Sequence, residues 1–153
     1  MRRNFGVTHY DPMTNLLEQA IALAVNAHAG QIDKAGNPYI LHPLQLMLQM
    51  ETEEERITAV LHDIVEDTAV TLDDLTQHGF PTNILNALCL LTHDPAVPYD
   101  DYILQFKANS LARRVKLADL AHNMDIRRLK NPTDKDWARL AKYRRAWDML
   151  AYG

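Results

Sequence analysis

The chain has 153 residues, which is enough for one domain with a sizeable core, and we expect a single domain over residues 1–153. Hydrophobic residues make up 47% of the chain and charged residues 24%, a composition of globular rather than disordered proteins. The net charge of −4 argues against DNA binding, and no apolar run is long enough to cross a bilayer.

The first helices can be located from their start and stop signals. Asp11-Pro12 predicts a helix start, and apolar residues recur at helical spacing until Gly30 ends the pattern. Residues 34–38 predict a turn, and His42-Pro43 predicts the start of a second helix. Thr52 and Glu55 form a capping-box pattern for a third helix, which the apolar spacing continues as far as Val65.

Similar signals divide the second half of the chain. Thr71 predicts another helix start, Pro81 opens an apolar helix to about Leu91, and a helix follows near residues 100–107. Ser110 is expected to cap a helix over residues 111–123, and Thr133 to start a C-terminal helix whose Trp137 and Trp147 are expected in the core. Strand-like alternation is absent. The predicted fold class is therefore all-α, a compact helical bundle.

The charges are unevenly distributed along the chain. Nine acidic residues lie between Glu51 and Asp74, whereas eleven of the sixteen lysines and arginines lie between Arg113 and Arg145. Two interpretations are open. The two segments form solvated helix faces of opposite sign, or they form an acidic metal site that faces a basic wall for phosphates.

The cysteine content and the N-terminus indicate the compartment. Cys89 is the single cysteine and stands in an apolar run, so we expect a small buried hydrophobic residue and no intrachain disulfide. No apolar segment follows the N-terminal basic residues, so no secretory signal is predicted. We expect a cytoplasmic protein with no membrane association; the oligomeric state is not predicted.

Residues 61–68 carry the strongest chemical signal. His62, Asp63, Glu66 and Asp67 interrupt an otherwise apolar helical pattern, and burial of such groups is costly unless a metal or ion pairs satisfy them. The adjacent His62 and Asp63 offer an imidazole and a carboxylate to the same cation. His28, by contrast, is expected to be a packed or hydrogen-bonded core histidine.

Two further positions match this signal. Asp119 interrupts an apolar stretch four residues before Asn123, and His42 stands at a predicted helix start. Alone, a His-Asp pair is more often a surface feature, and Asp119 more often an ion-pair partner. Together, two histidines and two aspartates suit a first-row transition metal in a catalytic site with open positions.

The motifs resemble those of a known family. The blocks are residues 27–31, residues 36–43, residues 61–68 and residues 115–124, in the family's order and spacing. Together they resemble the HD-type hydrolase domain of the RelA/SpoT family and, in size, the small stand-alone alarmone hydrolases.

The resemblance implies both a fold and a site. It implies an HD-domain helical bundle with a divalent metal, expected to be Mn²⁺, held by His42, His62, Asp63 and Asp119. Glu66 and Asp67 would orient and activate the attacking water. The nucleotide substrate would be bound by Lys34, Asn123, Arg139 and Tyr143. The implied reaction is hydrolysis of guanosine 3′,5′-bis(diphosphate), ppGpp, which gives GDP and pyrophosphate.

One position departs from the family pattern. Where the family usually has an arginine that stacks on the guanine, this chain has Asp33. We therefore keep two alternatives: a phosphatase acting on another nucleotide, such as a nucleoside monophosphate or NADPH, and a non-catalytic nucleotide-binding module. Glu66 and Asp67 argue against the second, because a protein that only binds has no need of a water-activating pair.

Overall fold

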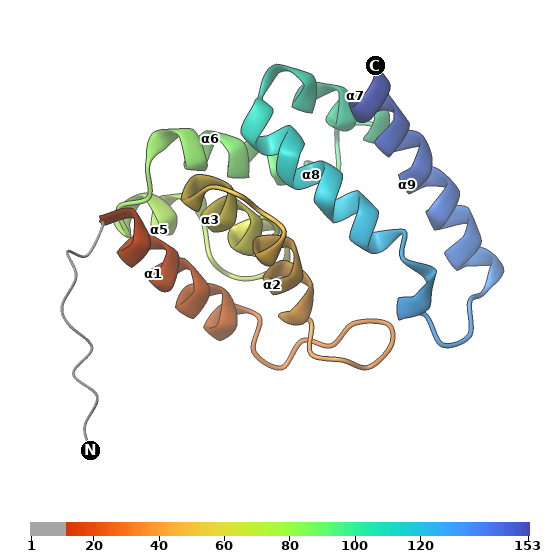
Figure 1. The fold of residues 1–153 in the computed structure, drawn as a ribbon, viewed down its shortest axis with the longest axis horizontal. Coiled ribbons are helices and arrows are strands. Elements are labelled where there is room, and N and C mark those ends of the chain that lie inside the picture. The colour runs from red at the N-terminus through yellow and green to blue at the C-terminus, as the bar shows by residue number, and fades with distance from the viewer. Residues whose placement is uncertain (1–11) are drawn as a thin grey trace.

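The computed structural model describes residues 12–153, and every regular element in this range is a helix (Figure 1). The α-helices are α1 (Pro12–Ala27), α2 (Leu41–Leu48), α3 (Glu53–Leu61), α4 (Ile64–Asp67), α5 (Leu72–Gln77), α6 (Thr82–Leu91), α7 (Tyr99–Leu104), α8 (Ser110–Asn123) and α9 (Asp134–Tyr152). The 3-10 turns are η1 (Gln105–Ala108) and η2 (Ile126–Arg128). An isolated bridge joins Ile32 and Pro38. The all-α prediction is confirmed; the predicted cap Asp11 lies outside the described residues.

The helix starts follow local hydrogen-bonding chemistry. Thr52, Thr71 and Thr133 each accept a hydrogen bond from the backbone N–H three residues later, and a carboxylate at that residue accepts one in return. The predicted cap Ser110 is wrong. Asn109 caps α8 instead, because its side-chain oxygen accepts from the N–H of Ala112 at 2.9 Å and its backbone is extended.

Helix α3 lies at the centre of the bundle (Figure 1). Every residue from Ile57 to Leu61 is fully buried, and α1, α2, α6 and α8 pack around the helix. Helix α9 runs along α8 and also contacts α7. A loop between α1 and α2 and the connection from α8 to α9 meet at one end of the molecule, where Lys34 pairs with Asp136 at 3.0 Å.

The predicted continuous helix from Thr52 to Val65 is interrupted at His62 and Asp63. Helix α3 ends at Leu61, and the single turn α4 begins at Ile64. Asp63 has φ −121° and ψ 10°, outside the helical range. The Ala59 carbonyl, which would accept only a backbone N–H within a regular helix, also faces the His62 ring, with Nδ1 at 2.8 Å. This local competition with helical hydrogen bonding accompanies the break.

Two burial predictions are wrong. Cys89 is exposed because the buried face of α6 consists of Ile84, Ala87, Leu88 and Leu91, and residue 89 lies off that stripe. Trp137 is 46% exposed, because it stands near the start of α9 and lines a cavity instead of packing into the core. Trp147 packs partly buried against the core. Among the described helices, none combines the length and apolarity needed to cross a membrane.

Candidate active site

Three of the four predicted metal ligands converge in the structure. His42 comes from α2, His62 from the end of α3 and Asp119 from α8, and all three are buried. One possible ligand atom from each lies within 4.8 Å of the others. Nε2 of His42 is 2.9 Å from Oδ1 of Asp119, and Nε2 of His62 is 3.5 Å from the same oxygen. These residues therefore form a cluster that a metal ion can occupy.

Neighbouring groups orient each member of this cluster. Nδ1 of His62 faces the Ala59 carbonyl at 2.8 Å, and since a carbonyl only accepts, that nitrogen carries the proton and donates. Nε2 of His62 is then the nitrogen that can bind a cation. Nδ1 of His42 lies 2.6 Å from Nδ1 of His122, and Nζ of Lys116 donates to Oδ2 of Asp119 at 2.9 Å.

Asp63 lies beside the cluster without joining its three-residue set. Its Oδ2 is 3.5 Å from Nε2 of His62 and accepts a hydrogen bond from the Tyr39 hydroxyl. Its Oδ1 is buried without a hydrogen bond, although Nε2 of His28 is 3.3 Å away. His28 is itself buried and hydrogen-bonded to Gln31, as predicted for a core histidine.

The protonation states follow from burial and neighbouring charge. Burial alone would lower the pKa of His62, but Asp63 and Asp119 outweigh it and raise the pKa to about 9. Burial would raise the pKa of Asp119, but Lys116, His42 and His62 hold it well below its ordinary value. Burial, Arg128 and His42 lower the pKa of His122 to about 4, so this histidine is neutral.

The donor set fits a divalent transition metal. Two imidazole nitrogens and a carboxylate oxygen form a mixed donor set of the kind that binds zinc, manganese and iron in catalytic centres. The Oδ1 atom of Asp63, buried and without a hydrogen bond, is a further donor beside the cluster. No cysteine stands among these residues, which separates the cluster from thiolate-rich structural zinc sites.

Glu66 and Asp67 lie on the cavity next to the cluster. Both line a cavity of about 340 Å³ together with His42, His62, Asp63 and Asp119. Oε1 of Glu66 accepts from the backbone N–H of His93 at 2.7 Å. Burial, then the charges of Asp63 and Glu66, raise the pKa of Asp67 above its ordinary value, so this carboxylate takes up a proton more readily.

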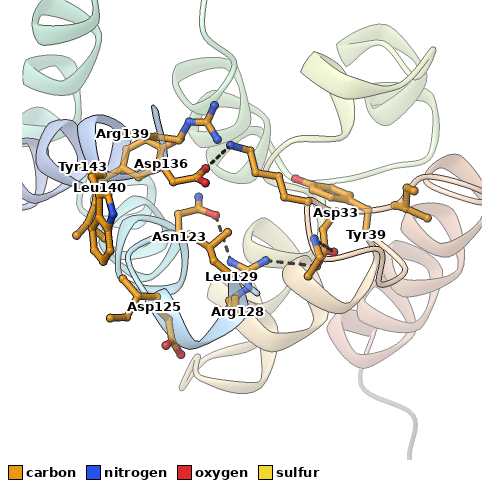
Figure 2. A pocket seen from close by; sticks show the side chains of 15 residues that line it. Asp33, Tyr39, Asn123, Asp125, Arg128, Leu129, Asp136, Arg139, Leu140 and Tyr143 are labelled. Atoms are coloured by element: carbon orange, nitrogen blue, oxygen red, sulfur yellow. Dashed lines mark hydrogen bonds and ion pairs between the residues drawn. The ribbon is translucent and has the colours of Figure 1, made fainter. Parts of the chain in front are cut away.

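A second cavity, of about 300 Å³, adjoins the first (Figure 2). Tyr39, Asn123 and Tyr143 line both cavities. Figure 2 shows Arg128, Arg139 and the apolar Leu129 and Leu140 around this cavity. The first cavity is polar and rich in carboxylates. The second combines apolar side chains with three cations (Lys34, Arg128 and Arg139) and three aspartates (Asp33, Asp125 and Asp136). Apolar surface beside a few polar groups suits a nucleotide.

All four predicted substrate residues line this second cavity. Nζ of Lys34 is 3.0 Å from Asp136, and Asn123 donates from Nδ2 to Oδ1 of Asp119 at 2.9 Å. Arg139 and Tyr143 stand on consecutive turns of α9. Some members of the acidic segment (Asp63, Glu66 and Asp67) and of the basic segment (Lys116, Arg128, Arg139 and Lys142) line the two cavities, whereas the other charged residues of both segments lie outside them.

Asp33 occupies the loop that closes this cavity. Its Oδ1 accepts from the backbone N–H groups of Ala35 and Asn37, both at 2.9 Å, and its Oδ2 is 3.9 Å from the guanidinium of Arg128 (Figure 2). Arg128 also donates to the His122 carbonyl at 3.0 Å. A cation therefore lines the cavity beside position 33, although it comes from η2.

Several residues at the site were assigned no role from the sequence. Tyr39, Lys116 and His122 contact predicted ligands directly, and His93 and Tyr99 line the larger cavity. Lys116 was detectable in principle, because it interrupts an apolar stretch one helical turn before Asp119. The others depend on contacts between distant segments.

The chain is similar in sequence to several known proteins. No family model matches the chain. A GTP pyrophosphokinase of Myxococcus xanthus is 28% identical over 151 residues, which is 88% of this chain and 20% of that protein. A guanosine-3′,5′-bis(diphosphate) 3′-pyrophosphohydrolase of Vibrio cholerae is 38% identical over 72 residues, 44% of this chain and 10% of that protein. The GTP pyrophosphokinase rsh of Brucella ovis is 31% identical over 134 residues, 77% of this chain and 18% of that protein.

The fold matches over nearly the whole chain. The solved structure of a metazoan orthologue of SpoT, described as hydrolysing ppGpp, superposes with a TM-score of 0.72 at 19% identity, covering 96% of this chain and 89% of that one. The chain is a RelA/SpoT homologue. This homologue spans about a fifth or less of the length of the curated relatives it matches.

Proposed function

We propose that this chain is a metal-dependent hydrolase of ppGpp or a closely related nucleotide that releases pyrophosphate from the 3′ position. The observation that carries the proposal is the buried cluster of His42, His62 and Asp119. The cluster lines a cavity together with Glu66 and Asp67, and that cavity adjoins a second one whose lining includes Lys34, Arg128 and Arg139 as well as three aspartates. We propose a single domain over residues 1–153.

Asp63 completes the proposed ligand set, and Mn²⁺ is the proposed metal. A divalent cation bound there would lower the pKa of a water molecule and withdraw charge from a phosphoryl oxygen. Glu66 and Asp67 are proposed to orient that water and to take its proton, and the raised pKa of Asp67 suits this task. Lys116 holds Asp119, and His122 holds His42, in place.

The nucleotide is proposed to lie across both cavities, with its 3′-diphosphate toward the cluster. Lys34 and Arg139 would bind phosphate, Tyr143 would contact the sugar, and Asn123 would shape the junction between the cavities. Water attacks the phosphorus joined to the 3′ oxygen, the bond to that oxygen breaks, and GDP and pyrophosphate leave. A cytoplasmic location is proposed from the lone cysteine and the nucleotide substrate.

Asp33 favours one alternative, an HD-type phosphatase on another nucleotide such as a nucleoside monophosphate or NADPH. The carboxylate places negative charge where the family has a base-stacking arginine. The other alternative, a non-catalytic nucleotide-binding module, has no specific observation in its favour. It would leave Glu66 and Asp67 without a task.

A manganese-supplemented nucleotide screen with product identification tests the proposal. We expect ppGpp to yield GDP and pyrophosphate, and a chelator to abolish the reaction. Release of orthophosphate from a nucleoside monophosphate or NADPH, with ppGpp untouched, would establish the alternative phosphatase. Nucleotide binding without any product would establish the binding module.

A further inference from the structure

The cavity beside the metal cluster is also lined by a tyrosine whose hydroxyl has no hydrogen-bond partner in the described part of the chain. This part of the lining comes from the α6–α7 connection, from α7 and from α9, and it includes His93, Tyr99, Tyr102 and Lys142. The Tyr102 hydroxyl donates to the Leu91 carbonyl at 2.7 Å, and Nε2 of His93 lies 2.8 Å from the Val97 carbonyl. Within residues 12–153, by contrast, the buried hydroxyl of Tyr99 makes no hydrogen bond.

An unsatisfied buried hydroxyl is costly, and native proteins rarely keep one without a reason. Tyr99 lines the cavity, but its hydroxyl is itself buried, so a bound group reaches that hydroxyl only when the side chain shifts toward the cavity. Burial raises the pKa of Tyr99 to about 12, with Lys116 opposing and Tyr143 and Asp119 adding to the rise. The hydroxyl therefore keeps its proton and can donate to an acceptor in the cavity.

Lys142 supplies a positive charge at the same place. Its Nζ lies 4.0 Å from the centre of the Tyr99 ring, a cation–π contact that holds the ammonium beside the cavity. No carboxylate in the described part of the chain pairs with Lys142, whereas Lys116 is paired with Asp119. The charge of Lys142 thus remains free for an anion.

We propose that Tyr99 and Lys142 form an anion subsite in the cavity beside the metal cluster, and that this subsite binds the released pyrophosphate. The inference rests on the proposed function for the identity of the nucleotide, but not for the binding of the anion. Four carboxylates line this cavity, Asp63, Glu66, Asp67 and Asp119, so a polyphosphate entering it needs a donor and an unpaired cation as well. Tyr99 and Lys142 provide both.

Calorimetric titration with inorganic pyrophosphate tests the subsite without any need for turnover. The protein is saturated with manganese, and the metal is kept in excess of the pyrophosphate. Tyr99→Phe and Lys142→Gln should each weaken pyrophosphate binding about tenfold or more, the scale of a lost hydrogen bond to a charged group. Arg144→Gln is the matched control, because Arg144 lies on the same helix and pairs with Asp148.

The design separates binding from folding. Tyr99→Phe removes a hydroxyl that has no partner, so the melting temperature should stay the same or rise. Manganese affinity should be unchanged in both variants, since neither residue contacts the cluster. Equal pyrophosphate affinity in the wild type and both variants would overturn the subsite, as would a wild type that binds no pyrophosphate. If both variants lose pyrophosphate affinity but ppGpp is not hydrolysed, the subsite stands and the proposed substrate is wrong.

Discussion

Position 33 offers the most informative single perturbation, because the structure changes what the sequence predicts there. From sequence alone, Asp33→Arg should restore the family's stacking cation and lower the Michaelis constant for ppGpp. In the structure, Oδ1 of Asp33 accepts two backbone N–H groups, those of Ala35 and Asn37, and Oδ2 faces Arg128. The carboxylate therefore shapes the loop that carries Lys34. We expect Asp33→Arg to destabilise the protein without a gain in affinity.

The magnitude follows from these contacts. Each lost hydrogen bond costs about 1 kcal/mol, so two cost about 2 kcal/mol. Two guanidinium groups at the present 3.9 Å separation would repel by at most ~4 kcal/mol at an effective dielectric of about 20, and solvent exposure reduces this to under about 1 kcal/mol. The sum of about 2–3 kcal/mol corresponds to a fall in melting temperature of roughly 5–10 °C for a chain of this size.

Asp33→Asn is the matched control. The amide oxygen can still accept both backbone N–H groups, so the melting temperature should fall by less than about 3 °C. Arg128→Gln should leave the fold intact and raise the Michaelis constant for ppGpp, because Arg128 lines the cavity beside Asp33. Stacking on a cation contributes on the order of 0.5–2 kcal/mol and does not read base edges, so guanine and adenine 3′-diphosphates should differ by about tenfold at most.

Thermal unfolding by circular dichroism and steady-state kinetics on the two nucleotides provide the measurements. An Asp33→Arg variant that melts with the wild type and binds ppGpp more tightly would refute the reasoning. It would show that the loop hydrogen bonds do not contribute measurably to stability, and that the proximity of Arg128 does not prevent an arginine at position 33 from binding ppGpp.

Three further predictions concern the metal cluster. His62→Ala or Asp63→Ala should abolish both bound metal and activity, whereas the exposed His78→Ala should not; full metal occupancy in either ligand variant, by elemental analysis, would contradict the assignment. The double variant Glu66→Gln, Asp67→Asn should keep metal and nucleotide but lose at least about a hundredfold in turnover, and near-normal turnover would remove their proposed role. In metal-free protein the pKa of His62 is raised from 6.5 to about 9. The charged His62 therefore contributes up to about 3 kcal/mol to the free energy of unfolding below about pH 6.5, and this contribution is lost as the pH rises through 9. Melting temperatures measured with chelator should therefore fall over that interval, whereas those of manganese-saturated protein should not. If the melting temperature depends on pH in the same way with and without manganese, the metal does not displace the proton of His62.

Local chemistry explains what the sequence could predict of the fold. The three threonine capping boxes depend on residues three apart, and all three appear where their pattern stands. The apolar spacing of α6 identified the helix but not the exposure of Cys89, because a run of neighbouring apolar residues covers more than one face. Ser110 failed as a cap because Asn109, one residue earlier, makes the same hydrogen bond.

The candidate site was predictable where its residues interrupt apolar helices. His62 and Asp119 were identified in this way, and His42 was identified by its place at a predicted helix start; the structure brings the three together. Their supporting contacts were not predictable. Tyr39 reaches Asp63 across 24 residues and His122 reaches His42 across 80, so only the packed fold brings them within hydrogen-bonding distance. Tyr99 and Lys142 lie on different helices, so their contact also depends on the packed fold.

The break after α3 is the point at which fold and chemistry depend on each other. Adjacent residues in a continuous helix point about 100° apart and do not face one another, so a His-Asp pair within a helix could not serve one cation. In this chain α3 ends at Leu61, and the backbone of Asp63 turns out of the helical range. Oδ2 of Asp63 then lies 3.5 Å from Nε2 of His62. The central buried helix thus supplies rigidity up to Leu61, and its termination there brings Asp63 beside His62, next to the cluster of His42, His62 and Asp119.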